Sequence, residues 1–409
     1  MAQSAVEPHN HADRLATFRK LREQLAPARD PASAFADYVE RPGSIGRRIA
    51  GELELAPAST HVVVGGVGSG KTTELLAVAS QLRTLADTVP VFLDVSAHHD
   101  LAKLKSGVAT LLFGLELADW IHASDLDTEA REAIRKPRKA LRDRANGYWA
   151  SVWEQEDEPE DDETIRVPGF LEHPDPVHPA VSASEENIGE LLATLRIAGK
   201  RGVALLDGLD RLSDVARFEE IVRNDIKALA AMGVGVVLVA PLRALYGIDR
   251  AVLDLFERTH YQAWIDVERD EQGREHLTSL LSRRVPPQMI EVDSVHQLVS
   301  ASGGVARDLL ALAQTACVES YLHGDERIGL RSVNAATEVF GRKHMQGLRP
   351  DEIEILERVR ARGQFVHTSE EDLALLMTRR VLEYRDQREQ PRYVVHPTIA
   401  PFLKEPNPF

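Results

Sequence analysis

The stretch Val62-Val63-Val64-Gly65-Gly66-Val67-Gly68-Ser69-Gly70-Lys71-Thr72-Thr73 decides the fold of this chain of 409 residues. Three β-branched residues predict a buried strand, which then breaks into glycines and ends on Lys-Thr-Thr. The run satisfies GxxxxGK[ST] from Gly65 to Thr72. Glycines let backbone N–H groups close around phosphate oxygens, Lys71 adds a positive charge, and the Thr72 hydroxyl can ligate Mg²⁺. We expect residues 65 to 73 to hold phosphate.

A helix is predicted directly after this loop, because apolar residues recur on one helical face at Leu75, Ala79, Leu82 and Ala86. The positive end of its dipole would point at the bound phosphates. A chance glycine-rich turn is the alternative. The strand before the loop and the helix after it favour a phosphate loop.

Composition narrows the class of protein. The chain is 43% hydrophobic and 28% charged, with a formal net charge of −15, which argues against coating nucleic acid or an anionic membrane through bulk charge. Net charge does not exclude a local basic patch. Cys317 is the only cysteine, so no internal disulfide can form, and a reducing cytoplasmic location is expected. With no apolar leader and no run of 18 apolar residues, neither export nor a membrane span is predicted.

Between the loop and residue 184 the sequence predicts a strand, two helices and an acidic run. Residues 89 to 95 predict a second buried strand, and residues 101 to 117 and 128 to 153 predict helices. Eight of the ten residues from 154 to 163 are acidic, so this run is expected to be disordered. It is either a solvated loop or a docking site for a basic partner. We therefore expect residues 119 to 184 to be an insertion in the core domain.

A second phosphate-site strand is predicted at residues 203 to 207, where apolar residues end in Asp207. A carboxylate at the end of such a strand reaches Mg²⁺ directly or through water, while Thr72 holds the other side of the ion. The pair of motifs is more specific than either half. Thr72 and Asp207 are thus the predicted metal ligands.

The catalytic base is less clear from the sequence. Many phosphate-loop ATPases place Glu directly after the metal-binding Asp, and this chain has Gly208 there. Asp210 is the nearest substitute, with capping of the helix that starts near residues 213 and 214 as an equal alternative. Weaker candidates are Glu74, Asp94, Glu219 and Glu220.

Further buried strands are predicted at residues 232 to 240 and 259 to 267. Alternating strands and helices imply a parallel sheet covered on both faces, with nucleotide at the carboxyl ends of the strands. Three arginines stand out by position. Arg243 follows the fourth strand, Arg258 precedes the fifth, and Arg307 follows a Gly-Gly turn.

With these motifs the chain resembles AAA+ or STAND-type P-loop ATPases over residues 38 to 320, including the branch of origin-recognition and transposition ATPases. The resemblance implies a P-loop NTPase parallel sheet, a helical lid and ATP with Mg²⁺ as cofactors. It implies that Arg307 contacts the γ-phosphate within its own chain, that Arg258 is an arginine finger offered to a neighbouring subunit, and that Arg243 matches the STAND arginine. Guanidinium groups suit these tasks because they are always charged and can engage phosphate through two N–H groups.

Two departures from that family put fast hydrolysis in doubt. Ala240-Pro241 stands where a polar residue is usual, and no acid directly follows Asp207. Nucleotide binding is not affected by either change.

Four domains are expected: an N-terminal helical lead-in at 1–60, an ATPase core at 61–267, a helical lid at 268–345 and a winged-helix-like domain at 346–409. From residue 350 onward the tail holds nine basic and eleven acidic residues. Its predicted recognition helix opens with Glu370-Glu371-Asp372, which argues against DNA as its ligand.

The sequence thus predicts an ATP-binding, slowly hydrolysing molecular switch that acts through a protein partner or through nucleotide-dependent self-assembly. One alternative is a DNA-remodelling or DNA-loading ATPase, which the acidic balance disfavours. A second is a nucleotide-holding scaffold without turnover. The absence of an NKxD motif disfavours a GTPase.

Overall fold

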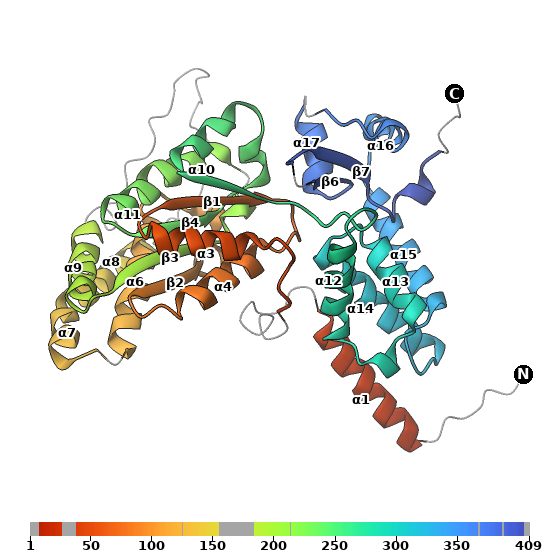
Figure 1. Cartoon of the computed structure of the whole chain (residues 1–409), viewed down its shortest axis with the longest axis horizontal. Helices are drawn as coiled ribbons and strands as arrows, with labels where there is room; N and C mark the ends of the chain where they lie inside the picture. The colour runs from red at the N-terminus through yellow and green to blue at the C-terminus, as the bar shows by residue number, and fades with distance from the viewer. Residues whose placement is uncertain are drawn as a thin grey trace, which may run out of the picture. The chain divides into compact units, whose positions relative to one another are not determined.

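The computed structural model describes residues 8–26, 38–124, 126–154, 184–212, 214–366, 369–386 and 388–404 (Figure 1). The chain divides into two compact units. Unit 1 comprises residues 1–44, 65–73 and 261–409, and unit 2 comprises residues 45–64 and 74–260. The phosphate loop thus groups with the C-terminal half of the chain.

A five-stranded sheet forms the centre of unit 2. Its strands are β1 (Thr60–Gly65), β2 (Thr88–Asp94), β3 (Arg201–Asp207), β4 (Gly235–Val239) and β5 (Arg258–Gln262), in the order β2-β3-β4-β1-β5. The pairs β2–β3, β3–β4 and β4–β1 are parallel. The predicted fold class is confirmed, although the last strand ends five residues earlier than expected.

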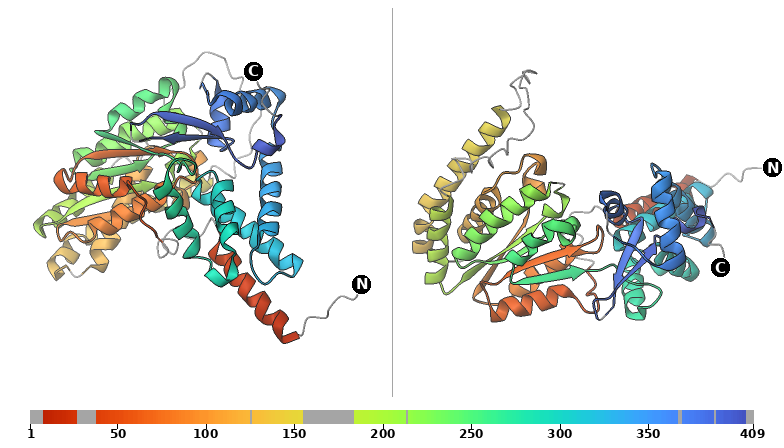
Figure 2. Two further views of the ribbon diagram at one scale, coloured as in Figure 1. Left: turned by 45° about the vertical axis from the view of Figure 1, so that its right-hand side comes forward. Right: turned by 90° about the horizontal axis from the view of Figure 1, so that it is seen from above.

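Helices cover both faces of this sheet (Figure 2). On one face, α3 (Ile45–Leu55) and α4 (Lys71–Leu82) pack on alternate residues of three strands, among them Val63, Val203 and Val237. The other face carries α6 (Val108–Ala123) and α9 (Ser184–Ile197), which contact β2 and β3. Every residue of β1 and of β4 is buried, as a sheet covered on both sides requires.

The remaining helices of unit 2 are α5 (Val95–His98), α7 (Thr128–Ala133), α8 (Arg135–Glu154), α10 (Val215–Ile221) and α11 (Lys227–Ala231). The helix predicted at 128–153 is thus two helices, and the helix predicted from 101 begins only at Val108 after a short 3-10 turn. The acidic run falls almost wholly in 155–183, outside the described residues.

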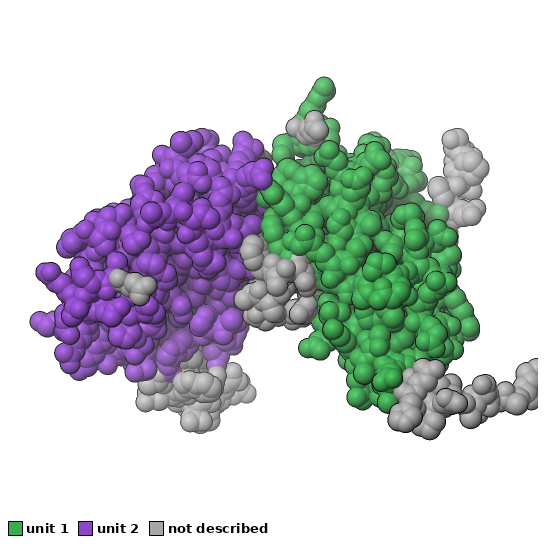
Figure 3. All heavy atoms as spheres, turned by 60° about the horizontal axis from the view of Figure 1, so that its bottom comes forward, with its two compact units in different colours: residues 1–44, 65–73, 261–409 green, residues 45–64, 74–260 purple. Residues whose placement is uncertain are grey.

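Unit 1, green in Figure 3, consists mostly of a helical bundle. It contains α1 (Pro8–Gln24), α12 (Glu271–Ser282), α13 (Val292–Ala301), α14 (Ala306–His323) and α15 (Leu330–Met345). The predicted lead-in helix is confirmed as α1, and its Phe18, Leu21 and Leu25 are buried in one core with residues of the lid helices. Arg14 donates to the carbonyl oxygens of Ser320, Tyr321 and Asp325 at the end of α14. The lead-in helix is therefore built into the lid.

The tail of unit 1 holds α16 (Pro350–Arg362), α17 (Glu370–Met377) and an antiparallel hairpin of β6 (Val381–Arg385) and β7 (Pro391–Val395). Two helices and a hairpin in this order form the predicted winged-helix-like arrangement. Among the described residues, no helix combines the length and the apolar run that a membrane crossing needs.

Candidate nucleotide site

The loop between β1 and α4 has the backbone that its glycines predict. Gly68 and Gly70 have φ angles of 80° and 98°, a region that L-residues with side chains rarely adopt. Lys71 begins α4, is 5% exposed, and donates from Nζ to the carbonyl oxygens of Gly65 at 3.0 Å and Gly66 at 3.1 Å. Its ammonium group therefore lies over the loop.

The Ser69 hydroxyl fits a phosphate-binding role. The residue is 8% exposed, and its Oγ has no hydrogen-bond partner within the described parts of the chain. A buried hydroxyl without a partner is costly, on the order of 1 to 3 kcal/mol. An anionic oxygen bound in the loop would satisfy it, so the residues present fit a nucleotide phosphate.

Trp264, which sequence reasoning missed, lies against the loop. Its side chain is 2% exposed and its Nε1 donates to the Val67 carbonyl oxygen at 3.2 Å. A Cβ atom built on Gly66 would fall 1.9 Å from the indole ring, so only glycine fits there. The one sequence signal for this contact is the extra glycine at position 66.

Arg307 lies beside the loop within unit 1. It is the second residue of α14 and is exposed. A Cβ atom on Gly68 would lie 2.8 Å from the Arg307 Cβ and 3.0 Å from a Val305 methyl group. The preceding turn is equally tight, because a Cβ on Gly304 would lie 1.8 Å from the Ile265 carbonyl oxygen. The Gly-Gly turn thus sets the start of α14 against the loop.

In unit 2, Asp207 ends β3, is 4% exposed, and pairs in register with Asp94 at the end of β2. Gly208 has a φ of 86°, and a Cβ there would lie 2.4 Å from the Asp94 Oδ1 and 2.9 Å from the Ser96 Oγ. This crowding explains why no acidic side chain follows Asp207.

Asp210, the candidate catalytic base, and Asp214, the helix cap, have different positions in the structure. Asp210 is half-buried in the 3-10 turn Leu209–Arg211. Asp214 is the residue that caps α10, since its Oδ1 accepts from the Arg217 N–H at 3.2 Å. The capping alternative for Asp210 is therefore wrong.

The weaker carboxylate candidates have structural partners. The Glu74 Oε2 accepts from the Gly46 N–H at 2.8 Å and so ties α3 to α4. The Asp94 Oδ1 accepts from both the N–H and the hydroxyl of Ser96.

The other two arginines lie in unit 2. Arg243 is half-buried in the 3-10 turn Leu242–Leu245. Arg258 is the first residue of β5, its side chain is 66% exposed, and its Nε is 3.8 Å from the Glu52 Oε2. Their roles toward nucleotide stay predictions.

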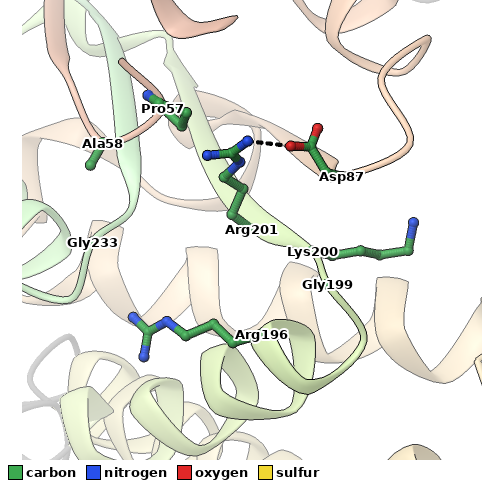
Figure 4. Close-up of a pocket in the computed structure, with 8 residues that line it drawn as sticks. All are labelled: Pro57, Ala58, Asp87, Arg196, Gly199, Lys200, Arg201 and Gly233. Atoms are coloured by element: carbon green, nitrogen blue, oxygen red, sulfur yellow. Dashed lines mark hydrogen bonds and ion pairs between the residues drawn. The ribbon is translucent and has the colours of Figure 1, made fainter. Parts of the chain in front are cut away.

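A separate hollow of about 450 Å³ lies at the opposite end of β3, where the strand begins (Figure 4). Its cationic side chains already have partners. Arg201 pairs with Asp87, Lys200 donates to the Ala86 carbonyl oxygen, and Arg196 donates to that of Met232. The residues that line the hollow include none of the predicted site residues.

No protein-family model matches the chain, and no curated protein matches it. Solved structures do match. The Aeropyrum pernix ORC1 protein in complex with DNA is similar over 92% of this chain and 93% of its own, at 15% identity and a TM-score of 0.44. Cdc6p from Pyrobaculum aerophilum is similar over 90% and 95%, at 13% identity and a TM-score of 0.45. The Thermotoga maritima RuvB Holliday junction branch migration motor is similar over 87% and 95%, at 14% identity and a TM-score of 0.38.

Proposed function

We propose that the chain binds ATP with Mg²⁺ and works as a slowly hydrolysing molecular switch. The buried Lys71 and the Ser69 hydroxyl without a partner support phosphate binding in the loop. In this proposal Thr72 and Asp207 hold Mg²⁺, and Arg307 senses the γ-phosphate from its place beside Gly68. Bound MgATP supplies a phosphoryl group activated for transfer to water.

The observation that carries the switch is the connection from the loop to the tail through Trp264. The indole that touches Gly66 and Val67 packs in one buried cluster with Val305, Leu382 and Tyr384. The Tyr384 hydroxyl also donates to the Gly303 carbonyl oxygen at 2.8 Å. A shift of the loop on nucleotide binding would therefore displace side chains of the hairpin β6–β7.

Ion pairs hold the same hairpin to the lid. Arg392 on β7 contacts Asp266 at 2.6 Å and Glu268 at 3.0 Å, and Arg379 contacts Asp308 at 2.8 Å. Asp308 is the residue directly after Arg307. The tail is thus held closed by contacts that begin one residue from the proposed γ-phosphate sensor, as an autoinhibitory or partner-binding domain would be.

Slow turnover follows from the crowding at Gly208, which leaves Asp210 as the proposed water-orienting group. We further propose that Arg243 assists at the site and that Arg258 acts on a neighbouring subunit. In that case an Arg258→Ala chain mixed with an Asp207→Ala chain would regain some activity at mixed interfaces. No mixture would rescue Arg307→Ala paired with Asp207→Ala.

The test measures ATP binding, turnover and particle size together. Calorimetry with wild-type protein, Lys71→Ala and the surface control Lys103→Ala should show binding lost only in Lys71→Ala. Wild-type affinity in Lys71→Ala would overturn the phosphate site. Trp264→Phe should keep ATP affinity but remove the ATP-induced change in hydrogen exchange of β6 and β7, and an unchanged response there would overturn the switch.

Two further results would redirect the proposal. Nucleotide-dependent binding of duplex DNA at moderate salt would favour a DNA-loading ATPase, against the net charge of the tail. ATP binding with no single-turnover hydrolysis would favour a scaffold that only holds nucleotide.

A further inference from the structure

Unit 2 contains a group of metal-ligating side chains that the proposed function does not use. Glu52 on α3, His61 on β1 and His260 on β5 each offer one ligand atom, and these atoms all lie within 4.8 Å of one another. The strands β1 and β5 are neighbours in the sheet, so the fold brings together residues that are 199 positions apart.

The distances within this group match a tetrahedral metal site. His61 Nδ1 is 3.1 Å from His260 Nε2 and 3.5 Å from Glu52 Oε2. His260 Nε2 and Glu52 Oε2 are 3.9 Å apart. Ligands bound to Zn²⁺ at about 2.0 to 2.2 Å in tetrahedral geometry lie about 3.3 to 3.6 Å from each other. Small side-chain shifts would bring all three atoms onto one ion.

Hydrogen bonds around His61 orient it for this task. The Ser59 hydroxyl donates to the Ala56 carbonyl oxygen at 2.6 Å, so toward His61 Nε2, 2.8 Å away, it can only accept. The neutral His61 ring therefore carries its proton on Nε2 and turns the lone pair of Nδ1 toward His260 and Glu52. A second ring nitrogen that donates to a fixed acceptor is the usual support of a metal-binding histidine.

The carboxylate also fits. The Glu52 Oε2 is buried and has no hydrogen-bond partner in the part of the chain that the structure describes. Arg258 lies 3.8 Å from this oxygen and Arg48 lies 3.4 Å from the other, but their side chains are 66% and 75% exposed. Both cations are thus well hydrated and compensate the carboxylate only weakly.

A plain hydrogen bond is the competing explanation of the short contact between the rings. In that state His260 Nε2–H donates to His61 Nδ1 at 3.1 Å, and Glu52 stays unsatisfied. A metal ion satisfies all three groups once His260 carries its proton on Nδ1. We propose that Glu52, His61 and His260 form a Zn²⁺ site that joins α3 to β1 and β5, with water in the fourth position.

The experiment uses the full chain, stripped with a chelator and titrated with Zn²⁺ or Co²⁺. We expect one ion per chain, with the visible absorption of tetrahedral Co²⁺ and an X-ray absorption spectrum of two imidazoles and one carboxylate. A wild-type protein that takes up no equivalent of Co²⁺ with this signature would overturn the proposal, whatever the variants do.

Variants separate the metal site from a structural hydrogen bond. His61→Gln and His260→Gln should each lose more than the 10- to 100-fold in Zn²⁺ affinity expected for the positioning variant Ser59→Ala. The exposed His122→Gln, in the same unit, should bind as wild type. Wild-type affinity in both His61→Gln and His260→Gln would place any bound ion elsewhere.

Discussion

The ion pair of Arg379 with Asp308 lends itself to a quantitative prediction. Asp308 is 1% exposed, and its Oδ2 accepts from the Arg379 Nε at 2.8 Å. Burial alone would raise the pKa of Asp308, yet the His396 ring, whose Nε2 is 3.5 Å from the Oδ2, and the charge of Arg379 together hold that pKa below its usual value. The carboxylate is therefore ionised in the folded chain and depends on its partners.

We expect Arg379→Met to destabilise the contact between α14 and the tail by about 3 to 5 kcal/mol at pH 7, the usual cost of leaving a buried charge without its partner. The sign of the pH dependence follows from the pKa. In the wild type a depressed pKa contributes stability above about pH 4, and this is lost as the pH falls through the folded pKa. Without Arg379 only His396 opposes the effect of burial, so the pKa of Asp308 rises and the variant gains less stability than the wild type as the pH rises above 4.

The difference in stability between the wild type and Arg379→Met should therefore grow from pH 4 to pH 7. Native-state hydrogen exchange of amides in α14 and β6 measures it locally, which avoids treating a chain with two units as a single two-state system. Arg380→Met is the matched control, because Arg380 donates to the carbonyl oxygens of His344 and Gln346 and to the hydroxyl of Thr378. A cost for Arg379→Met that is no larger than that of the control, or that does not change with pH, would refute the reasoning.

Three more predictions concern unit 2. Gly208→Ala should cost about 1 to 3 kcal/mol more in unfolding free energy than Gly199→Ala, since both have positive φ but only Gly208 has atoms within 4 Å of its Cβ; equal costs in urea titrations would contradict the crowding. Burial raises the pKa of Asp225 from 3.8 to about 6, so the wild type should lose stability from pH 4 to 6. Over that range the stability of Asp225→Asn should rise relative to the wild type by up to about 3 kcal/mol, and a stability difference independent of pH would exclude this. Asp210→Asn should bind MgATP but lose single-turnover hydrolysis, whereas unchanged hydrolysis would exclude Asp210 as the base.

The sequence predicts most of the nucleotide loop and its neighbours because the responsible interactions are local. Glycines at 68 and 70 adopt the backbone that the motif implies, and the apolar runs become strands in one parallel sheet. The winged-helix-like tail likewise appears as two helices and the hairpin β6–β7, and the helical lead-in contains α1 and α3.

The errors come from contacts between distant residues. Helix α6 starts at Val108, after the predicted start, because Asp225 accepts from the N–H groups of Gly107 and Thr110 and so caps it from 118 positions away. The sequence does not predict the contact of Trp264 with the loop, because an isolated tryptophan forms no motif. No periodicity encodes either contact.

The pairing of α1 with α14 affects how the chain is made. Arg14 contacts the Asp325 carbonyl oxygen across 311 residues, and Phe18 and Leu21 are buried in the same core. At about 5 to 20 residues per second, ribosomal synthesis leaves roughly 15 to 60 s between the appearance of α1 and that of its partner. The nascent chain therefore exposes the apolar face of α1 to solvent during this time, until α14 has been synthesised.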